Sequence, residues 1–175
     1  MTDLYEVVLE PATQSDAALL ANLLELYSHD LSEVFVLEPG SDGRFGYEKL
    51  PRYWSEPERR FPFLIRAGAR LAGFALVTRG SPVSDDPNIF DIAEFFVLRR
   101  YRHAGVGRGA AFLLWNRFAT RWIVRVSEGN QEGVRFWSNV ITEYTGGMAV
   151  ETTRSGSPHA WRVFSFNSAN RRTCP

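Results

Sequence analysis

One glycine-rich stretch decides how this sequence is interpreted: Arg102-His103-Ala104-Gly105-Val106-Gly107-Arg108-Gly109. It lies between an apolar run at 89–98, which predicts a strand, and a helical pattern at 107–120. Gly105 and Gly107 let a ligand approach the backbone closely, and the N–H groups at a helix N-terminus converge on an anion. The stretch therefore predicts a site for a pyrophosphate-bearing ligand.

Two other nucleotide-binding motifs fit this loop less well. A Walker A motif ends in Lys-Ser or Lys-Thr, and neither pair follows the glycines here. A dinucleotide fingerprint has the spacing G-x-G-x-x-G in the first strand-helix unit, with an acidic residue about 20 positions later. The stretch 105–109 has a different last spacing and comes late in the chain. A glycine-rich turn that binds no ligand stays open as the structural alternative.

The stretch resembles the signature of the GNAT acetyltransferase superfamily, which reads Gln/Arg-x-x-Gly-x-Gly/Ala after the fourth strand. Residues 102–107 match it at every defined position, and Val97 stands five residues earlier, where the family usually has an apolar strand residue. The second part of the family pattern, an Asn followed by a helix with an aromatic pair, is matched by Asn130 with Phe136-Trp137. The likeness extends over residues 89–140.

The resemblance implies acetyl-CoA as the cosubstrate. The backbone of Phe95, Phe96 and Val97 would pair with the pantetheine arm like an added strand. Asn130 would hydrogen-bond that arm or orient the loop leading to it, although a helix N-cap before Gln131 explains this residue equally well. The residues that would hold the pyrophosphate are Arg102, His103, Ala104, Gly105, Val106, Gly107 and Arg108.

Acyl transfer to an amine also needs a proton acceptor, whichever family performs it. A protonated amine has no free lone pair, and a lysine-like amine has a pKa of about 10.4. Glu94 is the candidate general base, because it lies on the strand that leads to the glycine loop and has apolar neighbours. Partial burial would raise its pKa toward a useful value. The alternative is a Glu94 that points to solvent or pairs with a surface arginine.

Two positions depart from the family pattern. Many members have a Tyr seven residues after the Asn, as a general acid for the thiolate, whereas this chain has Trp137. An indole N–H cannot donate a proton as an acid at pH 7. Members that acetylate ribosomal protein N-termini have a Glu five residues before the Asn, where this chain has Arg125. Neither catalytic role carries over, and that substrate class loses support.

Patterning along the chain predicts a mixed α/β fold with a central, mostly antiparallel twisted sheet flanked by helices. Strands are expected at 5–9, 63–67, 71–78, 89–98, 122–126, 148–153 and 161–166, and helices after Ser15-Asp16, around 47–54, at 107–120 and at 131–140. The long connection 28–60 gathers aromatic residues, which we interpret either as a functional segment or as a cap on the core. We expect a single domain at 1–169 and a frayed tail at 170–175.

Composition excludes several classes of protein. Twenty basic residues balance twenty acidic ones, so no global field drives binding to nucleic acid or to an anionic membrane. The N-terminus has no signal-peptide pattern, and no apolar run approaches the length of about 20 residues that spans a membrane. Cys174, the single cysteine, excludes an internal disulfide and is a poor candidate for a nucleophile. We expect a soluble, cytoplasmic protein.

Other features are expected to carry no chemistry. His29, His103 and His159 are dispersed without metal-ligand spacing, so no metal site is predicted. The prediction is an N-acetyltransferase that passes an acetyl group from acetyl-CoA to an amine of a small molecule or peptide by direct attack. The rival is a non-catalytic acyl-CoA-binding module, and an ATP- or NAD-binding protein is a more distant one. The sequence identifies neither the acceptor nor the oligomeric state, and a homodimer is compatible with it.

Overall fold

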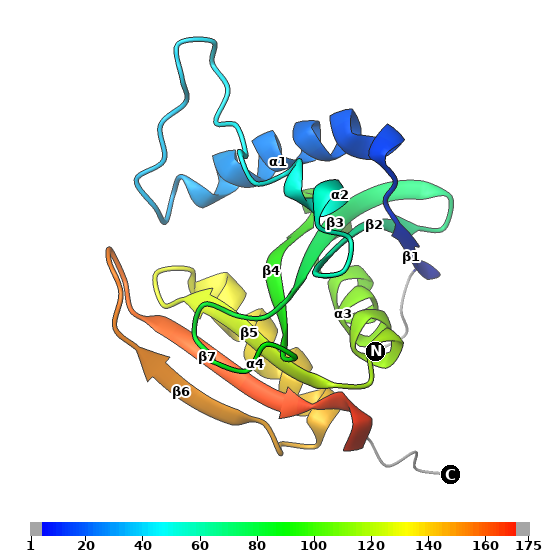
Figure 1. Ribbon diagram of the computed structural model, residues 1–175, viewed down its shortest axis with the longest axis vertical. Coiled ribbons are helices and arrows are strands. Elements are labelled where there is room, and N and C mark those ends of the chain that lie inside the picture. Colours follow the sequence, from blue (N-terminus) through cyan, green and yellow to red (C-terminus); the bar gives the residue numbers. More distant parts are fainter. Residues whose placement is uncertain (1–4, 171–175) are drawn as a thin grey trace. The chain divides into compact units, whose positions relative to one another are not determined.

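The computed structural model describes residues 5–170, and Figure 1 shows the arrangement of its elements. The helices are α1 (Ala17–Leu31), α2 (Arg52–Ser55), α3 (Val106–Arg117) and α4 (Gln131–Thr145). The strands are β1 (Val7–Pro11), β2 (Arg60–Ala67), β3 (Arg70–Arg79), β4 (Phe90–Val97), β5 (Arg121–Ser127), β6 (Val150–Arg154) and β7 (Trp161–Asn167). Short 3₁₀ turns lie at Gln14–Asp16, Arg99–Tyr101 and Ser168–Asn170.

The strands form one seven-stranded sheet in the order β1-β2-β3-β4-β5-β7-β6. The pairs β1–β2, β5–β7 and β6–β7 are antiparallel, and β4–β5 is parallel. The predicted mixed α/β class, with a mostly antiparallel sheet and flanking helices, is confirmed.

The chain divides into two compact units. The first comprises the residues up to Leu76 together with Glu94–Val106, and the second comprises Val77–Ala93 together with the residues from Gly107 onward. The single domain at 1–169 stays a prediction.

In the first unit, a hairpin and two helices enclose a hydrophobic cluster. β2 and β3 are joined through Gly68, whose φ of 59° suits a glycine turn. Helix α1 buries Leu20, Leu23 and Leu24 against Phe74 of β3, as the spacing of its leucines predicts. Figure 1 shows the long excursion that leaves the end of α1 and returns to the short helix α2.

The start of α1 is capped differently from the expectation at Ser15-Asp16. The Thr13 backbone N–H and hydroxyl both donate to the Asp16 carboxylate, at 2.8 and 2.9 Å. This is a capping box on the preceding 3₁₀ turn, and Asp16 itself makes no side-chain cap to α1. The prediction named Asp16 correctly as a capping residue. Its partner is Thr13, three residues earlier, because a turn of 3₁₀ helix precedes the α-helix.

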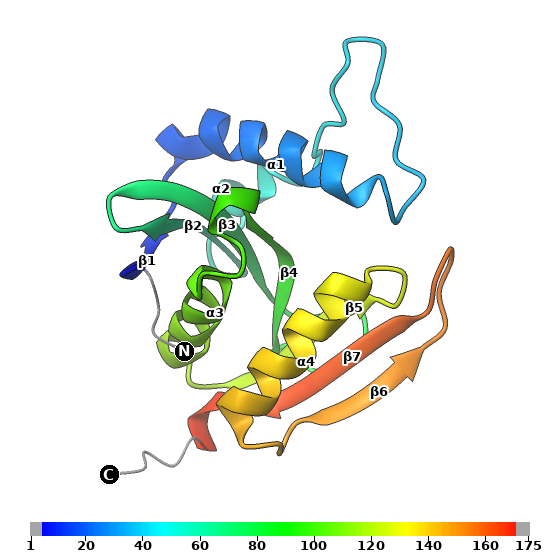
Figure 2. The same ribbon diagram turned by 180° about the vertical axis from the view of Figure 1, so that it is seen from behind.

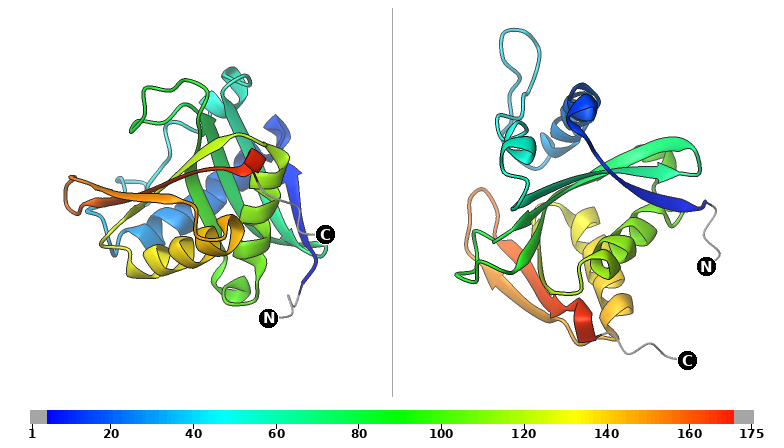
Figure 3. Two further views of the ribbon diagram at one scale, coloured as in Figure 1. Left: turned by 90° about the horizontal axis from the view of Figure 1, so that it is seen from below. Right: turned by 45° about the vertical axis from the view of Figure 1, so that its right-hand side comes forward.

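In the second unit, α4 lies against β5 and β7, as Figure 2 shows. Its buried face includes Val134, Trp137, Ile141 and Tyr144. An aromatic cluster joins Trp115 of α3 to Trp137, Tyr144 and Phe166, with ring centroids 4.8 to 6.2 Å apart. Figure 3 shows β6 and β7 as a twisted two-stranded ribbon at the edge of the sheet.

Several predicted boundaries shift by a few residues. Helix α4 runs five residues beyond the predicted end at 140 and stops at Gly146, which takes a left-handed φ of 63°. Helix α2 begins later than the predicted 47–54, because the preceding residues form turns. Of the predicted tail, Asn170 ends a 3₁₀ turn, while 171–175, including Cys174, lie outside the described residues. No helix in the described part of the chain combines the length and apolarity that a membrane crossing requires.

Candidate active site

Glu94 lies on β4 in the first unit and is half-buried. Its two carboxylate oxygens each accept a hydrogen bond from a tyrosine: Tyr27 donates to Oε2 at 2.7 Å, and Tyr47 donates to Oε1 at 2.9 Å. Glu94 thus departs from the alternative in which it faces solvent or pairs with a surface arginine. Because both bonds go to the carboxylate, they stabilise its ionised form.

The two tyrosines are positioned by different kinds of structure. Tyr27 belongs to α1, and its ring packs edge-on against Phe74 at 5.7 Å and tilted against Phe96 at 5.9 Å. Tyr47 belongs to the irregular segment between α1 and α2. Burial, followed by the charge of Glu94, raises the pKa of Tyr47 well above its ordinary value of 10.0, so this phenol keeps its proton at neutral pH.

A third tyrosine stands behind this pair. Tyr53 of α2 is 2% exposed, and its hydroxyl has no hydrogen-bond partner among the described residues. Burial and the charge of Glu94 raise its pKa above the ordinary value, while Arg60, whose guanidinium carbon lies 5.4 Å from the ring centroid, lowers it. Two phenols therefore donate to the carboxylate, and a third lies within the range of its charge.

The next three residues of β4 are the strand segment predicted to receive the pantetheine arm. Phe96 is 5% and Val97 is 9% exposed, and Leu98 donates its N–H to the carbonyl of Ala72 on β3. A Cβ on Gly73 would lie 2.0 Å from the carbonyl oxygen of Phe96. Glycine is therefore required where β3 passes Phe96, and this close approach fixes the part of β4 that follows Glu94.

The glycine loop begins with a 3₁₀ turn and ends at the start of α3. His103 has a φ of 59° and Gly105 a φ of 82°, so two residues of the loop adopt left-handed conformations. Such a conformation is uncommon for a residue other than glycine. Helix α3 begins at Val106, and the first N–H groups of an α-helix have no partner within the helix. The backbone here has the geometry of an anion site.

The arginine side chains of the loop have partners within the protein. Arg102 donates to the carbonyl of Val97 at 2.8 Å and to Asp30 at 2.5 Å, and Arg99 donates to the same carboxylate at 2.7 Å. Burial raises the pKa of Asp30, but the bonds from Arg99 and Arg102 outweigh it and the net shift is downward. Arg108 pairs with Glu143 and lies over the ring of Phe112 at 4.7 Å. Because these guanidinium groups already have carboxylate partners, the loop backbone is the better candidate for holding a phosphate.

Asn130 caps helix α4, in the second unit. Its side-chain oxygen accepts a hydrogen bond from the N–H of Gly133 at 2.9 Å. The N-cap explanation of this residue therefore holds. Trp137, seven residues later, is 7% exposed and packs against Trp115 with ring centroids 6.2 Å apart, so its indole is a packing group.

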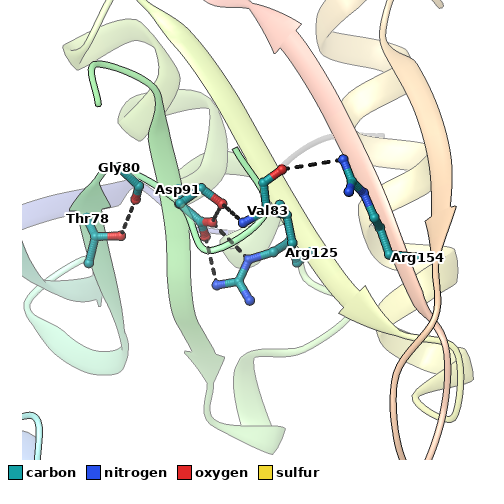
Figure 4. Close-up of polar contacts among 7 residues, drawn as sticks. Thr78, Gly80, Val83, Asp91, Arg125 and Arg154 are labelled. Carbon is teal, nitrogen blue, oxygen red and sulfur yellow. Dashed lines mark hydrogen bonds and ion pairs between the residues drawn. The ribbon is translucent and has the colours of Figure 1, made fainter. Parts of the chain in front are cut away.

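Arg125 also has a structural partner in the second unit. Its guanidinium donates to both oxygens of Asp91, at 2.8 and 3.2 Å, and Asp91 is fully buried. The hydroxyl of Ser81 donates to the same carboxylate, which ties the β3–β4 loop to the sheet. Figure 4 shows Arg125 pointing toward Asp91. The figure also shows Arg154 reaching the carbonyl of Val83, at 3.5 Å, on the same loop.

The remaining candidates have no catalytic arrangement. No cluster of three or more potential metal-ligating side chains occurs within residues 5–170. His159 packs against the backbone of Gly129, where an added Cβ would lie 2.3 Å from its ring. A cavity of about 400 Å³ in the second unit is lined by residues such as Val83, Arg121, Ile123 and Arg154, and includes none of the predicted site residues.

The structure thus groups the predicted residues in two sets. Glu94, Phe95–Val97 and the loop 102–106 belong to the first unit, and Gly107, Arg108 and Asn130 belong to the second. Sequence reasoning missed Tyr27 and Tyr47 as partners of Glu94. No pattern in the sequence points from Tyr27 to Glu94, and the aromatic residues gathered in the connection 28–60 were the only signal for Tyr47.

No protein-family model and no curated protein matches this chain. Among solved structures, the chain is similar to an acetyltransferase from Thermus thermophilus, with 20% identity, a TM-score of 0.68, and coverage of 95% of this chain and 100% of that one. Salmonella typhimurium yncA, solved with its cofactor acetyl-CoA, has 10% identity, a TM-score of 0.66 and coverage of 97% of both chains. A Vibrio cholerae spermidine N-acetyltransferase, in complex with CoA and spermine, has 11% identity, a TM-score of 0.65, and coverage of 93% and 96%.

Proposed function

The chain has the GNAT acetyltransferase fold, and we propose that it is an enzyme that transfers an acetyl group from acetyl-CoA to a primary amine. The observation that carries this proposal is the position of the Glu94 carboxylate. Glu94 lies on the strand that continues into Phe95–Val97 and the glycine loop, and two tyrosine hydroxyls donate to its oxygens. A fold alone hosts many functions. Among these functions, a carboxylate held by two phenols on the strand that leads to the glycine loop supports acetyl transfer.

The strand segment after Glu94 and the glycine loop would bind acetyl-CoA. The backbone of residues 102–106, with left-handed His103 and Gly105, would hold the pyrophosphate together with the N-terminus of α3. Phe95, Phe96 and Val97 would supply backbone groups to the pantetheine arm. Gly107 and Arg108 continue the same loop into α3, and Asn130 would orient the loop before α4. When bound, acetyl-CoA supplies the activated acetyl group.

The amine must lose a proton as it attacks, and Glu94 is the group that accepts it. Its carboxylate is half-buried, the two phenolic hydrogen bonds favour its ionised form, and the raised pKa of Tyr47 keeps that phenol protonated at neutral pH. Trp137 is a packing group, so the departing thiolate takes its proton from water or from another side chain. A thiol pKa of about 8.5 makes the thiolate an adequate leaving group.

The acceptor is an amine of a small molecule or a peptide. The protein acts in the cytoplasm, and the reaction needs no metal ion. The spermine in the Vibrio cholerae structure is a rational first probe. The second candidate is a non-catalytic acyl-CoA-binding module, which the presence of Trp137 at the usual position of the acid favours.

A CoA-release assay tests the proposal. Purified protein is given saturating acetyl-CoA and, separately, spermine, an alanine-initiated peptide, a lysine-containing peptide and a simple alkylamine. We expect CoA release with at least one amine, and a loss of about 10²–10⁴-fold in Glu94→Gln with unchanged acetyl-CoA affinity. Glu48→Gln, an exposed glutamate on the neighbouring segment, is the matched control.

The outcomes separate the candidates. Tight acetyl-CoA binding without release of CoA to any amine would indicate the binding module. Displacement of acetyl-CoA by ATP or NAD would point to the nucleotide alternative. Acetyl transfer that Glu94→Gln leaves unchanged would keep the enzyme and remove Glu94 as its base.

A further inference from the structure

The proton acceptor in the first unit already has a phenolic donor on each of its oxygens. Both oxygens of Glu94 already accept phenolic O–H groups, at 2.7 Å from Tyr27 and 2.9 Å from Tyr47. Hydrogen bonds to a carboxylate favour its ionised form and make it a weaker base. Each oxygen keeps a second acceptor site, so an amine that approached Glu94 directly would meet a carboxylate whose basicity both phenols already lower.

We propose that Glu94 takes the proton of the acceptor amine through the hydroxyl of Tyr47, and that Tyr27 holds the opposite oxygen of the carboxylate in place. This inference rests on the proposed acetyltransferase function. The amine nitrogen forms a bond to the thioester carbonyl carbon, and the carbon–sulfur bond breaks with its electron pair on sulfur. The amine proton moves to the Tyr47 oxygen while the Tyr47 proton moves to Oε1 of Glu94. The carboxyl then returns its proton to solvent.

The two tyrosines are suited to different parts in this transfer. Tyr27 is fixed on α1, with its ring packed against the buried side chains of Phe74 and Phe96. Tyr47 lies on the segment between α1 and α2, which has no helix or strand until Arg52. Segments of this kind open at a lower free-energy cost than packed helices. The ring of Tyr47 packs against the same hydrophobic cluster as Tyr27, and its hydroxyl oxygen can accept from an incoming amine while its O–H donates to Glu94.

The surroundings keep Tyr47 protonated between turnovers. Burial, the charge of Glu94 and the neighbouring Tyr53 raise its pKa, and Arg60 opposes this shift. A free phenolate is thus disfavoured, and a transfer in which one proton arrives as the other leaves avoids it. Tyr53 lies close enough to influence Tyr47, and its buried hydroxyl has no hydrogen-bond partner among the described residues.

Two matched variants test the relay, because Tyr47→Phe and Tyr27→Phe each remove one phenolic donor from the same carboxylate. With the best amine of the panel, we expect Tyr47→Phe to lower kcat by about 10²–10³-fold, within the range for loss of acid–base catalysis, with KM and acetyl-CoA affinity nearly unchanged. Tyr27→Phe should lower kcat by less than about tenfold. Tyr47→Phe combined with Glu94→Gln should cost little more than either change alone, because the two groups act as a unit.

A proton inventory in mixtures of H₂O and D₂O gives a readout that a purely structural role would not move. Two protons in flight give a curved dependence of kcat on deuterium content in the wild type, and Tyr47→Phe should make it linear. Equal, small effects of the two Tyr→Phe changes, or a linear wild-type inventory, would overturn the relay and leave Glu94 as a direct base. A Glu94→Gln enzyme of full activity would remove the base, and a protein that acetylates no amine would remove the proposed function itself.

Discussion

Tyr47 donates a hydrogen bond of 2.9 Å to Oε1 of Glu94, and this contact joins the irregular segment after α1 to a strand 47 positions later. The charge of Glu94 also acts on the buried phenol of Tyr53. The group is therefore electrostatically linked, and its titration should differ from that of ordinary tyrosines.

Alkaline titration should show this linkage. The pKa values of Tyr47 and Tyr53 are raised above the ordinary value of 10.0 by burial and by Glu94. A raised folded pKa contributes stability that is fully present below pH 10 and is lost as the pH rises from there through the folded values. Tyrosinate absorbance should therefore have a late component that Tyr47→Phe and Tyr53→Phe each reduce, and that disappears in urea. A single early transition in the folded wild type would contradict the arrangement.

Gly105→Val should abolish the rise in melting temperature that acetyl-CoA produces. A ligand that binds only the native state stabilises it by mass action, and a β-branched residue is strained at the φ of 82° and blocks approach to the backbone. Gly43→Val is the control, because Gly43 has a similar φ of 76° and open space around it. Equal ligand-induced shifts in the two variants, measured by thermal melting, would place the pyrophosphate elsewhere.

Gly73→Ala should destabilise the first unit and the strand segment after Glu94. The added Cβ would meet the carbonyl oxygen of Phe96 at 2.0 Å, and because this is backbone it cannot move aside like a side chain. A cost of about 1–3 kcal/mol in urea unfolding is expected from such overpacking. Wild-type stability in this variant would mean that β3 and β4 separate more easily than their contact suggests.

Trp137 is expected to act through packing alone. Trp137→Ala should cost about 3–5 kcal/mol of stability, because the side chain is 7% exposed within an aromatic cluster. Trp137→Phe should be mild in both stability and turnover. If Trp137→Phe lowered kcat by about a hundredfold with folding and acetyl-CoA affinity intact, the indole N–H would have a catalytic part after all.

The buried pair of Asp91 and Arg125 should behave as a unit. Arg125→Met leaves a fully buried carboxylate with only the Ser81 hydroxyl among its described polar partners, and should cost about 3–5 kcal/mol. Replacing both residues, as Asp91→Leu with Arg125→Met, should cost less than the sum of the single changes. Arg121→Met, which removes an exposed pair with Asp86, is the control and should cost less than about 1 kcal/mol in denaturant titrations.

The order of elements and the glycine loop follow from local sequence. The spacing of Leu20, Leu23 and Leu24 determines the buried face of α1, and the alternation of apolar runs with glycine turns determines the hairpin at Gly68. Gly105 takes a left-handed φ in the loop where the sequence places it between strand and helix. These features depend on neighbours within a few positions, whose geometry the residue types themselves restrict.

The partners of the candidate site depend on contacts that local sequence does not specify. Glu94 receives Tyr27 from 67 positions away and Tyr47 from 47, and Arg102 turns to Asp30 across 72 positions. The family resemblance assigned Arg102 to the pyrophosphate, and sequence reasoning named Glu94 as the candidate base with no partner for its carboxylate beyond a surface arginine. The sequence determined which groups are capable of chemistry, through residue type and spacing. Only the tertiary structure decided which of them meet, because side chains find their hydrogen-bond partners after the packing of α1 and the sheet has brought distant segments together.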